Sequence, residues 1–94
     1  MAHLGLDSTV TIAEGVVSCD LSGDTALLHV PSGTYFTMNR VGTKVWSLIQ
    51  HPRPAREVHA VLVECYDVDA DDCARDLLQL LNDLSEHRLI AVIE

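Results

Sequence analysis

The sequence has no long apolar run. Its uninterrupted apolar stretches are only a few residues long, whereas a membrane-spanning helix needs about 20 consecutive apolar residues. The first seven residues also lack the basic start and the apolar stretch of a secretory signal. The sequence therefore predicts no membrane-spanning segment, and we expect a cytoplasmic protein with no membrane partner.

Motifs of catalysis and cofactor binding are missing as well. The chain has no glycine-rich phosphate loop, no Gly-x-Ser-x-Gly turn and no metal-type spacing among its histidines and cysteines. The acidic run 67–72 begins like a calcium loop, but Asp72 stands where glycine is needed and Leu78 where a glutamate closes the loop. We therefore expect no enzyme activity, no cofactor and no metal.

Basic residues are scarce, and cysteines are few. Six Lys and Arg side chains stand against fourteen Asp and Glu, so the net charge is −8, which favours basic or apolar partners over phosphate. Three widely spaced cysteines favour buried free thiols over a disulfide framework. The chain has 94 residues, of which 48% are apolar and 21% charged. This length and composition predict one globular domain, 1–94, with its core at about 10–92.

Turn signals divide residues 10–38 into short strands. Gly15, Ser22–Asp24 and Pro31–Gly33 separate segments that are rich in Val, Thr and Leu. The pattern predicts a three-stranded antiparallel meander, with one possible extra strand at Val10–Ala13; its strands are Val16–Leu21, Thr25–Val30 and Thr34–Met38. The third of these strands lies at an edge of the meander, so it has unpaired backbone groups.

The apolar period becomes helical after Asn39. Asn39 is the expected N-cap of a first helix that ends before Pro52, and Asp69 is the expected N-cap of a third helix. The helices are expected at 41–49, about 55–66 and 70–87, followed by an extended tail at 89–93. This order predicts an α+β fold, a winged helix-turn-helix with a β-meander followed by three helices.

A winged helix also suits a DNA-binding transcription regulator, in which the third helix enters the major groove. Such a helix needs a basic face. The segment 70–87 carries five acidic side chains, and Arg75 is its one Arg or Lys. We therefore do not expect nucleic acid as a partner, and the regulator is kept as an alternative only.

Several segments together resemble the PqqD family, which supplies the leader-recognition element of ribosomally made, modified peptides. The resemblance covers about residues 10–92 and is carried by Gly33–Asn39, Val41–Ile49, Tyr66–Asp69 and the run that starts at Asp76. Stand-alone members of this family in lasso-peptide gene clusters show the same order of motifs.

The resemblance implies that a leader peptide binds as a fourth strand along Thr34–Met38, in a groove against the third helix. Apolar side chains would hold the anchors of the leader, and the acidic ones would steer its basic residues. The implied contact residues are Thr34, Tyr35, Phe36, Thr37, Met38, Asp72, Cys73, Arg75, Asp76, Leu77, Leu78 and Leu80.

The resemblance also implies partners. The expected ones are the precursor peptide, a separate leader peptidase and a macrocyclase of the same pathway. A further alternative is a structural docking subunit whose edge strand binds a larger modification enzyme.

Overall fold

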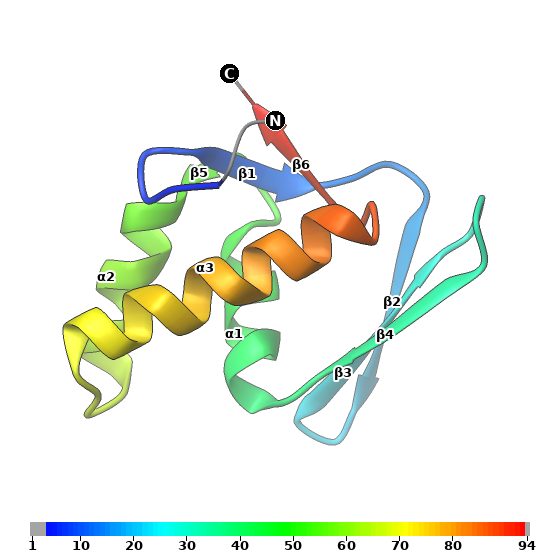
Figure 1. The fold of residues 1–94 in the computed structure, drawn as a ribbon. Coiled ribbons are helices and arrows are strands. Elements are labelled where there is room, and N and C mark those ends of the chain that lie inside the picture. The colour runs from blue at the N-terminus through cyan, green and yellow to red at the C-terminus, as the bar shows by residue number, and fades with distance from the viewer. Residues whose placement is uncertain (1–3, 94) are drawn as a thin grey trace.

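The computed structural model describes residues 4–93, so the two ends of the expected 1–94 domain lie outside the described residues. It contains three helices and two small antiparallel sheets (Figure 1). The helices are α1 (Arg40–Leu48), α2 (Ala55–Cys65) and α3 (Ala70–Glu86). The predicted α+β fold with a meander followed by three helices is confirmed.

Side chains just outside the helices fix where two of them begin. The Asn39 side chain accepts a hydrogen bond of 3.0 Å from the backbone N–H of Gly42, which caps α1. The Asp69 carboxylate accepts bonds of 3.0 Å from the N–H groups of Asp71 and Asp72, which caps α3. Such caps satisfy donors that have no partner within the helix. Both caps agree with the sequence prediction.

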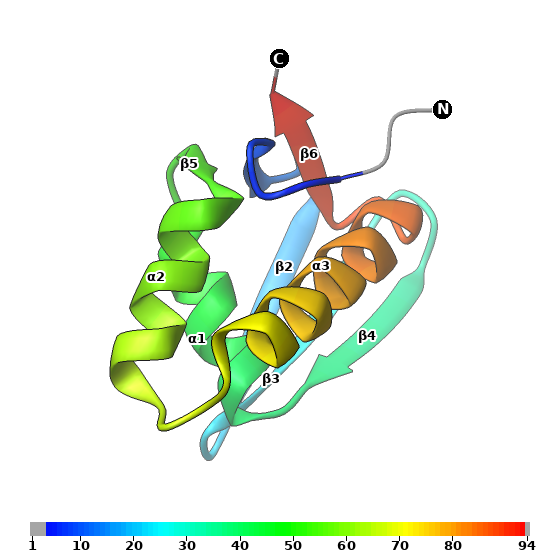
Figure 2. The same ribbon diagram turned by 60° about the vertical axis from the view of Figure 1, so that its left-hand side comes forward.

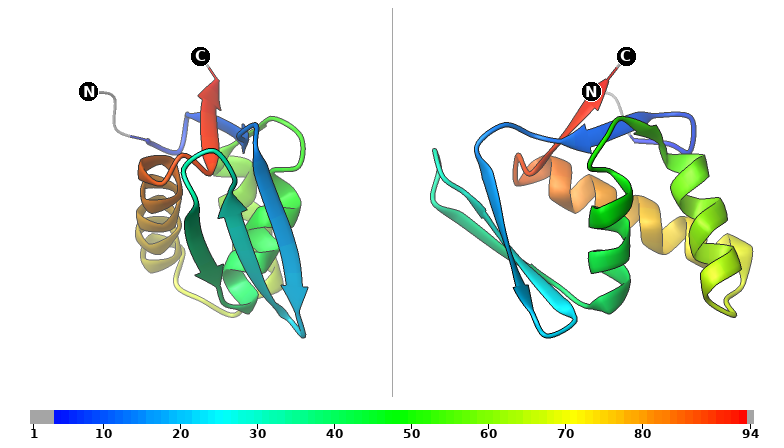
Figure 3. Two further views of the ribbon diagram at one scale, coloured as in Figure 1. Left: turned by 90° about the vertical axis from the view of Figure 1, so that its right-hand side faces the viewer. Right: turned by 180° about the vertical axis from the view of Figure 1, so that it is seen from behind.

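The predicted meander is one of the two sheets. Its strand order is β2-β3-β4, so β4 lies at an edge. The helix α1 packs on one face of this sheet, and none of the described helices covers the other face (Figure 3). The three strands are β2 (Val16–Leu21), β3 (Asp24–His29) and β4 (Thr34–Met38).

The second sheet joins the two ends of the described chain. The extra strand expected near Val10 pairs with the tail, so that Thr9 lies opposite Ile93, and a two-residue strand pairs on its other side. The sequence patterns did not predict this sheet, because its pairings join segments that are far apart in the chain. Its strand order is β5-β1-β6, with β1 at Thr9–Ile12, β5 at Arg53–Pro54 and β6 at Ile90–Ile93.

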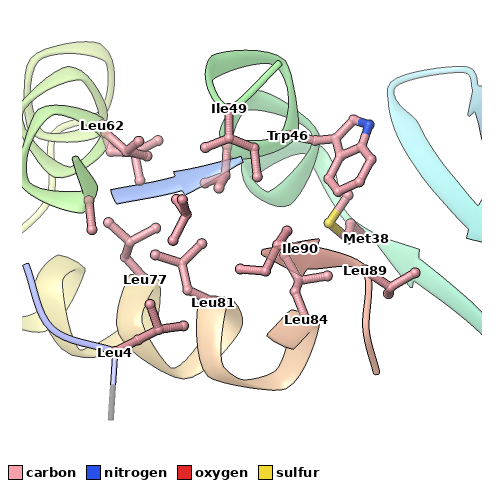
Figure 4. Packing of buried hydrophobic residues seen from close by; sticks show 14 of the residues in the cluster. Leu4, Met38, Trp46, Ile49, Leu62, Leu77, Leu81, Leu84, Leu89 and Ile90 are labelled. Atoms are coloured by element: carbon pink, nitrogen blue, oxygen red, sulfur yellow. The ribbon is translucent and has the colours of Figure 1, made fainter. Parts of the chain in front are cut away.

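The apolar core lies between α3 and the other two helices. Leu77, Leu81 and Leu84 of α3 face Leu62 of α2 and Ile49, the C-cap of α1, and all five side chains are buried (Figure 4). Burial of each such side chain stabilises the fold by about 1.5–3 kcal/mol. The position of α3 relative to β4 is therefore fixed by the packing of α3 against the first two helices.

The expectation of buried cysteines is wrong for two of the three. All three thiols are free, but Cys19 and Cys65 are exposed and Cys73 is half-buried. Cys19 lies in β2, an edge strand of the meander with five of its six residues exposed. Cys65 ends α2, one turn beyond its last buried residue, Leu62.

No helix within residues 4–93 is long and apolar enough to cross a membrane.

Candidate functional site

A groove of about 630 Å³ lies between β4 and the first half of α3. In Figure 2, α3 runs in front of the meander and β4 lies beside it. The start of α1 and the connection between α2 and α3 complete the walls. The lining residues are Phe36, Thr37, Met38, Asn39, Val41, Gly42, Leu62, Tyr66, Val68, Asp69, Asp72, Cys73, Asp76, Leu77 and Leu80.

Most of the groove wall is apolar and open to solvent. Val41 and Val68 are 42% and 46% exposed, although both are large apolar residues. Phe36 and Leu80 are half-buried and pack against the core from opposite walls. Clustered exposed apolar side chains are typical of binding surfaces on soluble proteins. The groove can therefore bury apolar side chains of a ligand.

One wall of the groove is the unpaired edge of β4. In the described range 4–93, this strand pairs with β3 alone, with Phe36 opposite Leu27 and Tyr35 opposite Leu28. In an antiparallel pair, alternate residues direct their N–H and C=O groups to the partner strand, and the others direct them outward. The outward groups of β4 can therefore pair with an added extended peptide.

An aromatic contact joins Phe36 of the groove wall to the end of α3. The rings of Phe36 and His87 lie 5.4 Å apart between centroids, with their planes inclined at 56°. Tilted aromatic pairs at this separation are favourable. Because His87 directly follows α3, this contact joins the end of that helix to β4.

Three carboxylates, Asp69, Asp72 and Asp76, lie on the groove wall. Burial raises the pKa of the Cys73 thiol above its usual value, and the neighbouring Asp76 carboxylate raises it further. This thiol therefore stays protonated at neutral pH, which makes it a poor nucleophile. Within residues 4–93, no three potential ligand residues cluster so as to hold a metal ion.

The structure brings most of the sequence-predicted contact residues together. Those that line the groove are Phe36, Thr37, Met38, Asp72, Cys73, Asp76, Leu77 and Leu80. Leu77 is only 3% exposed, so it belongs mainly to the core. The assignment of these residues to peptide contact stays a prediction.

Four predicted contact residues lie outside the groove wall. Tyr35 is 68% exposed and lies on the opposite face of β4 from Phe36. The hydroxyl group of Thr34, the first residue of β4, lies 2.8 Å from that of Ser32 in the preceding turn. Arg75 forms an ion pair with Asp72 of its own helix, and Leu78 is half-buried elsewhere on α3.

Sequence reasoning missed the contribution of α1 and α2. Asn39, Val41 and Gly42 enter the groove from the start of α1, and Leu62 and Tyr66 enter from the end of α2. Gly42 gave one available signal, since a glycine inside a helix costs about 1 kcal/mol and often marks a close approach. A Cβ atom at Gly42 would lie 2.7 Å from the Met38 Cβ.

We expect Gly42→Ala to destabilise the fold. The added methyl group must displace Met38, and overpacking of this kind costs about 1–3 kcal/mol, which outweighs the better helix propensity of alanine. Urea unfolding followed by circular dichroism measures the change. Thr43→Ala is not a suitable control, because the Thr43 hydroxyl group bonds to Thr25 of the neighbouring sheet. Ser47→Ala is the better control, because Ser47 is exposed and its hydroxyl group donates only to the Lys44 carbonyl of the same helix. Unchanged stability of Gly42→Ala would show that Met38 moves freely.

Comparisons with known proteins give a consistent result. One solved structure, described as "TbiB1 in Complex with the TbiA(beta) Leader Peptide", is similar to this chain with a TM-score of 0.79 and 32% sequence identity, over 85% of this chain and 93% of that chain. A comparison with curated protein sequences found no match. The model of the family "Coenzyme PQQ synthesis protein D (PqqD)" matches residues 24–90. Because this match covers more than half of the chain and includes β3, β4 and all three helices, the chain belongs to the PqqD family.

Proposed function

We propose that this chain binds the leader segment of a ribosomally synthesised precursor peptide as an extra strand along β4. The observation that carries the proposal is an unpaired strand edge that forms one wall of an apolar groove. The similar structure TbiB1 is described in complex with a leader peptide, which supports the same role here. The chain acts by binding and carries out no chemistry.

Backbone pairing alone does not provide the affinity. Two or three of the five β4 residues face outward, so an added strand gains about four to six hydrogen bonds of about 1 kcal/mol net each. Ordering each leader residue costs about 1–2 kcal/mol, which offsets this gain. The surplus must come from apolar leader side chains that the groove buries, at about 25 cal/mol per Å². Strand pairing therefore sets the register, and the groove provides the affinity.

The protein then presents the bound precursor to separate enzymes. We place the chain in a lasso-peptide pathway, in which it delivers the precursor to a leader peptidase and a macrocyclase. This part of the proposal rests on the family resemblance of the stand-alone members. Leader binding on one edge of the meander leaves the rest of the precursor free to reach such an enzyme.

A backbone methylation scan tests the proposal. The probe is a fluorescently labelled leader peptide, taken from a short precursor gene to be sought next to the gene for this protein. It is titrated by anisotropy, with a scrambled peptide and a random DNA duplex as controls. We expect affinity to fall at least about tenfold when an N–H group that faces β4 is methylated, because a hydrogen bond is lost and the methyl group clashes. Methylation of the next residue, whose N–H points away, should have little effect.

The alternation between neighbouring residues is the critical readout. Binding without any alternation would reject strand addition, although the groove could still bind the peptide. Failure of the intact leader to bind would reject leader recognition itself, and salt-sensitive binding of the DNA would favour the regulator.

A further inference from the structure

The three groove carboxylates differ in the hydrogen bonds and ion pairs that they form within the chain. Asp69 accepts hydrogen bonds from the first turn of α3, and Asp72 forms an ion pair with Arg75. Asp76 has no hydrogen bond or ion pair with any residue in the described range 4–93. Among residues 4–93, no Lys, Arg or His side chain lines the groove. The groove therefore presents one carboxylate that its own chain does not neutralise.

We infer that the leader segment in the groove carries a lysine or arginine that pairs with Asp76. The inference rests on the proposed function and adds the charge of the recognised peptide. A peptide that covers the groove removes water from Asp76, and desolvation of an unpaired charge is costly. A cationic leader side chain removes this cost, whereas an acidic one would add repulsion in a chain with a net charge of −8.

The geometry also restricts where the basic residue stands. Asp76 lies one turn from both Cys73 and Leu80 on α3, and all three side chains line the groove. A strand added to β4 presents every second side chain to this wall. The leader residue that reaches Asp76 and the apolar residue that packs on Leu80 therefore lie on the same face of the strand. We expect an even number of residue steps between them.

A double-mutant cycle tests the pairing. The protein variant is Asp76→Asn, and the peptide variant replaces the basic leader residue by methionine, which keeps the length of the side chain. Each change alone should weaken binding about two- to fivefold, and both changes together should weaken it no further. Raising the salt concentration should shrink the effect.

Glu86→Gln is the matched control. It removes the same charge from the same helix, but Glu86 is exposed and does not line the groove. At physiological salt, the affinity of this variant for the leader should stay within about 1.5-fold of that of the unaltered protein. The charge exchange, Asp76→Lys with a glutamate in place of the basic leader residue, should restore most of the binding that either change loses alone.

The outcomes separate this inference from the function on which it rests. Tight binding of the leader with unchanged affinity of Asp76→Asn would overturn the inference alone. Additive losses in the cycle, or a leader with no basic residue at an even spacing from an apolar one, would also overturn it. If the unaltered protein does not bind the leader, the proposed function fails, and the inference fails with it.

Discussion

Replacing Leu80 by asparagine is expected to weaken leader binding about 100-fold or more without unfolding the protein. Leu80 is half-buried on the groove wall, so a bound peptide completes its burial. The substitution loses about 1.5–3 kcal/mol of apolar contact and adds about 1–3 kcal/mol for an amide that is desolvated without a partner. A sum near 3 kcal/mol corresponds to about 100-fold in affinity.

The control for this prediction is Leu78→Asn. Leu78 is also a half-buried leucine of α3, but it does not line the groove. The affinity of Leu78→Asn for the leader should stay within about twofold of that of the unaltered protein. Both variants should keep the helical circular dichroism of the unaltered protein. Equal losses for the two variants would mean that the peptide binds a wider surface of α3 than the groove. An unaffected Leu80→Asn variant would move the anchor site away from this wall.

Leu77→Asp is expected to unfold the domain. Leu77 is 3% exposed and packs in the core with Leu81 and Leu62. Removal of a buried leucine costs about 2–5 kcal/mol, and a buried unpaired carboxylate adds several more. This total is comparable to the about 5–15 kcal/mol that stabilises a typical domain. Thermal unfolding followed by circular dichroism should show little or no cooperative transition at neutral pH.

Leu77→Met separates the two roles of this position. Methionine has a similar volume, and such exchanges usually cost less than about 1.5 kcal/mol. This variant should therefore fold and bind the leader nearly as well as the unaltered protein. A folded, stable Leu77→Asp variant would show that the side chain points into the groove and not into the core.

Local patterns predicted the elements of the fold well. The apolar spacing and the two caps placed the three helices within about two residues, and Val16–Leu21 and Thr34–Met38 have the predicted bounds. These signals are local, because a cap or a turn acts within a few residues. The edge position of β4 also followed, since consecutive short strands with tight turns form a meander.

The sequence could not predict which walls complete the site. β5 has only two residues, and β1 pairs with a segment about 80 residues away, so neither pairing leaves a local pattern. The groove contacts of Val41 and Tyr66 depend on how α1 and α2 pack against the rest of the fold. The spacing of apolar residues in the sequence does not predict this packing. The helical period predicts that Leu77 and Leu80 lie on the apolar face of α3. It does not predict that Leu77 belongs to the core and Leu80 to the groove wall.

The sheet of β1 and β6 has a consequence for modular assembly. The first and last strands pair on the side of the molecule away from the junction of β4 and α1 (Figure 1), and this junction lines the groove. A polypeptide joined beyond either strand is therefore connected at a point remote from the groove. Such a unit can be fused to a larger protein through either strand without a linker having to pass across its recognition surface.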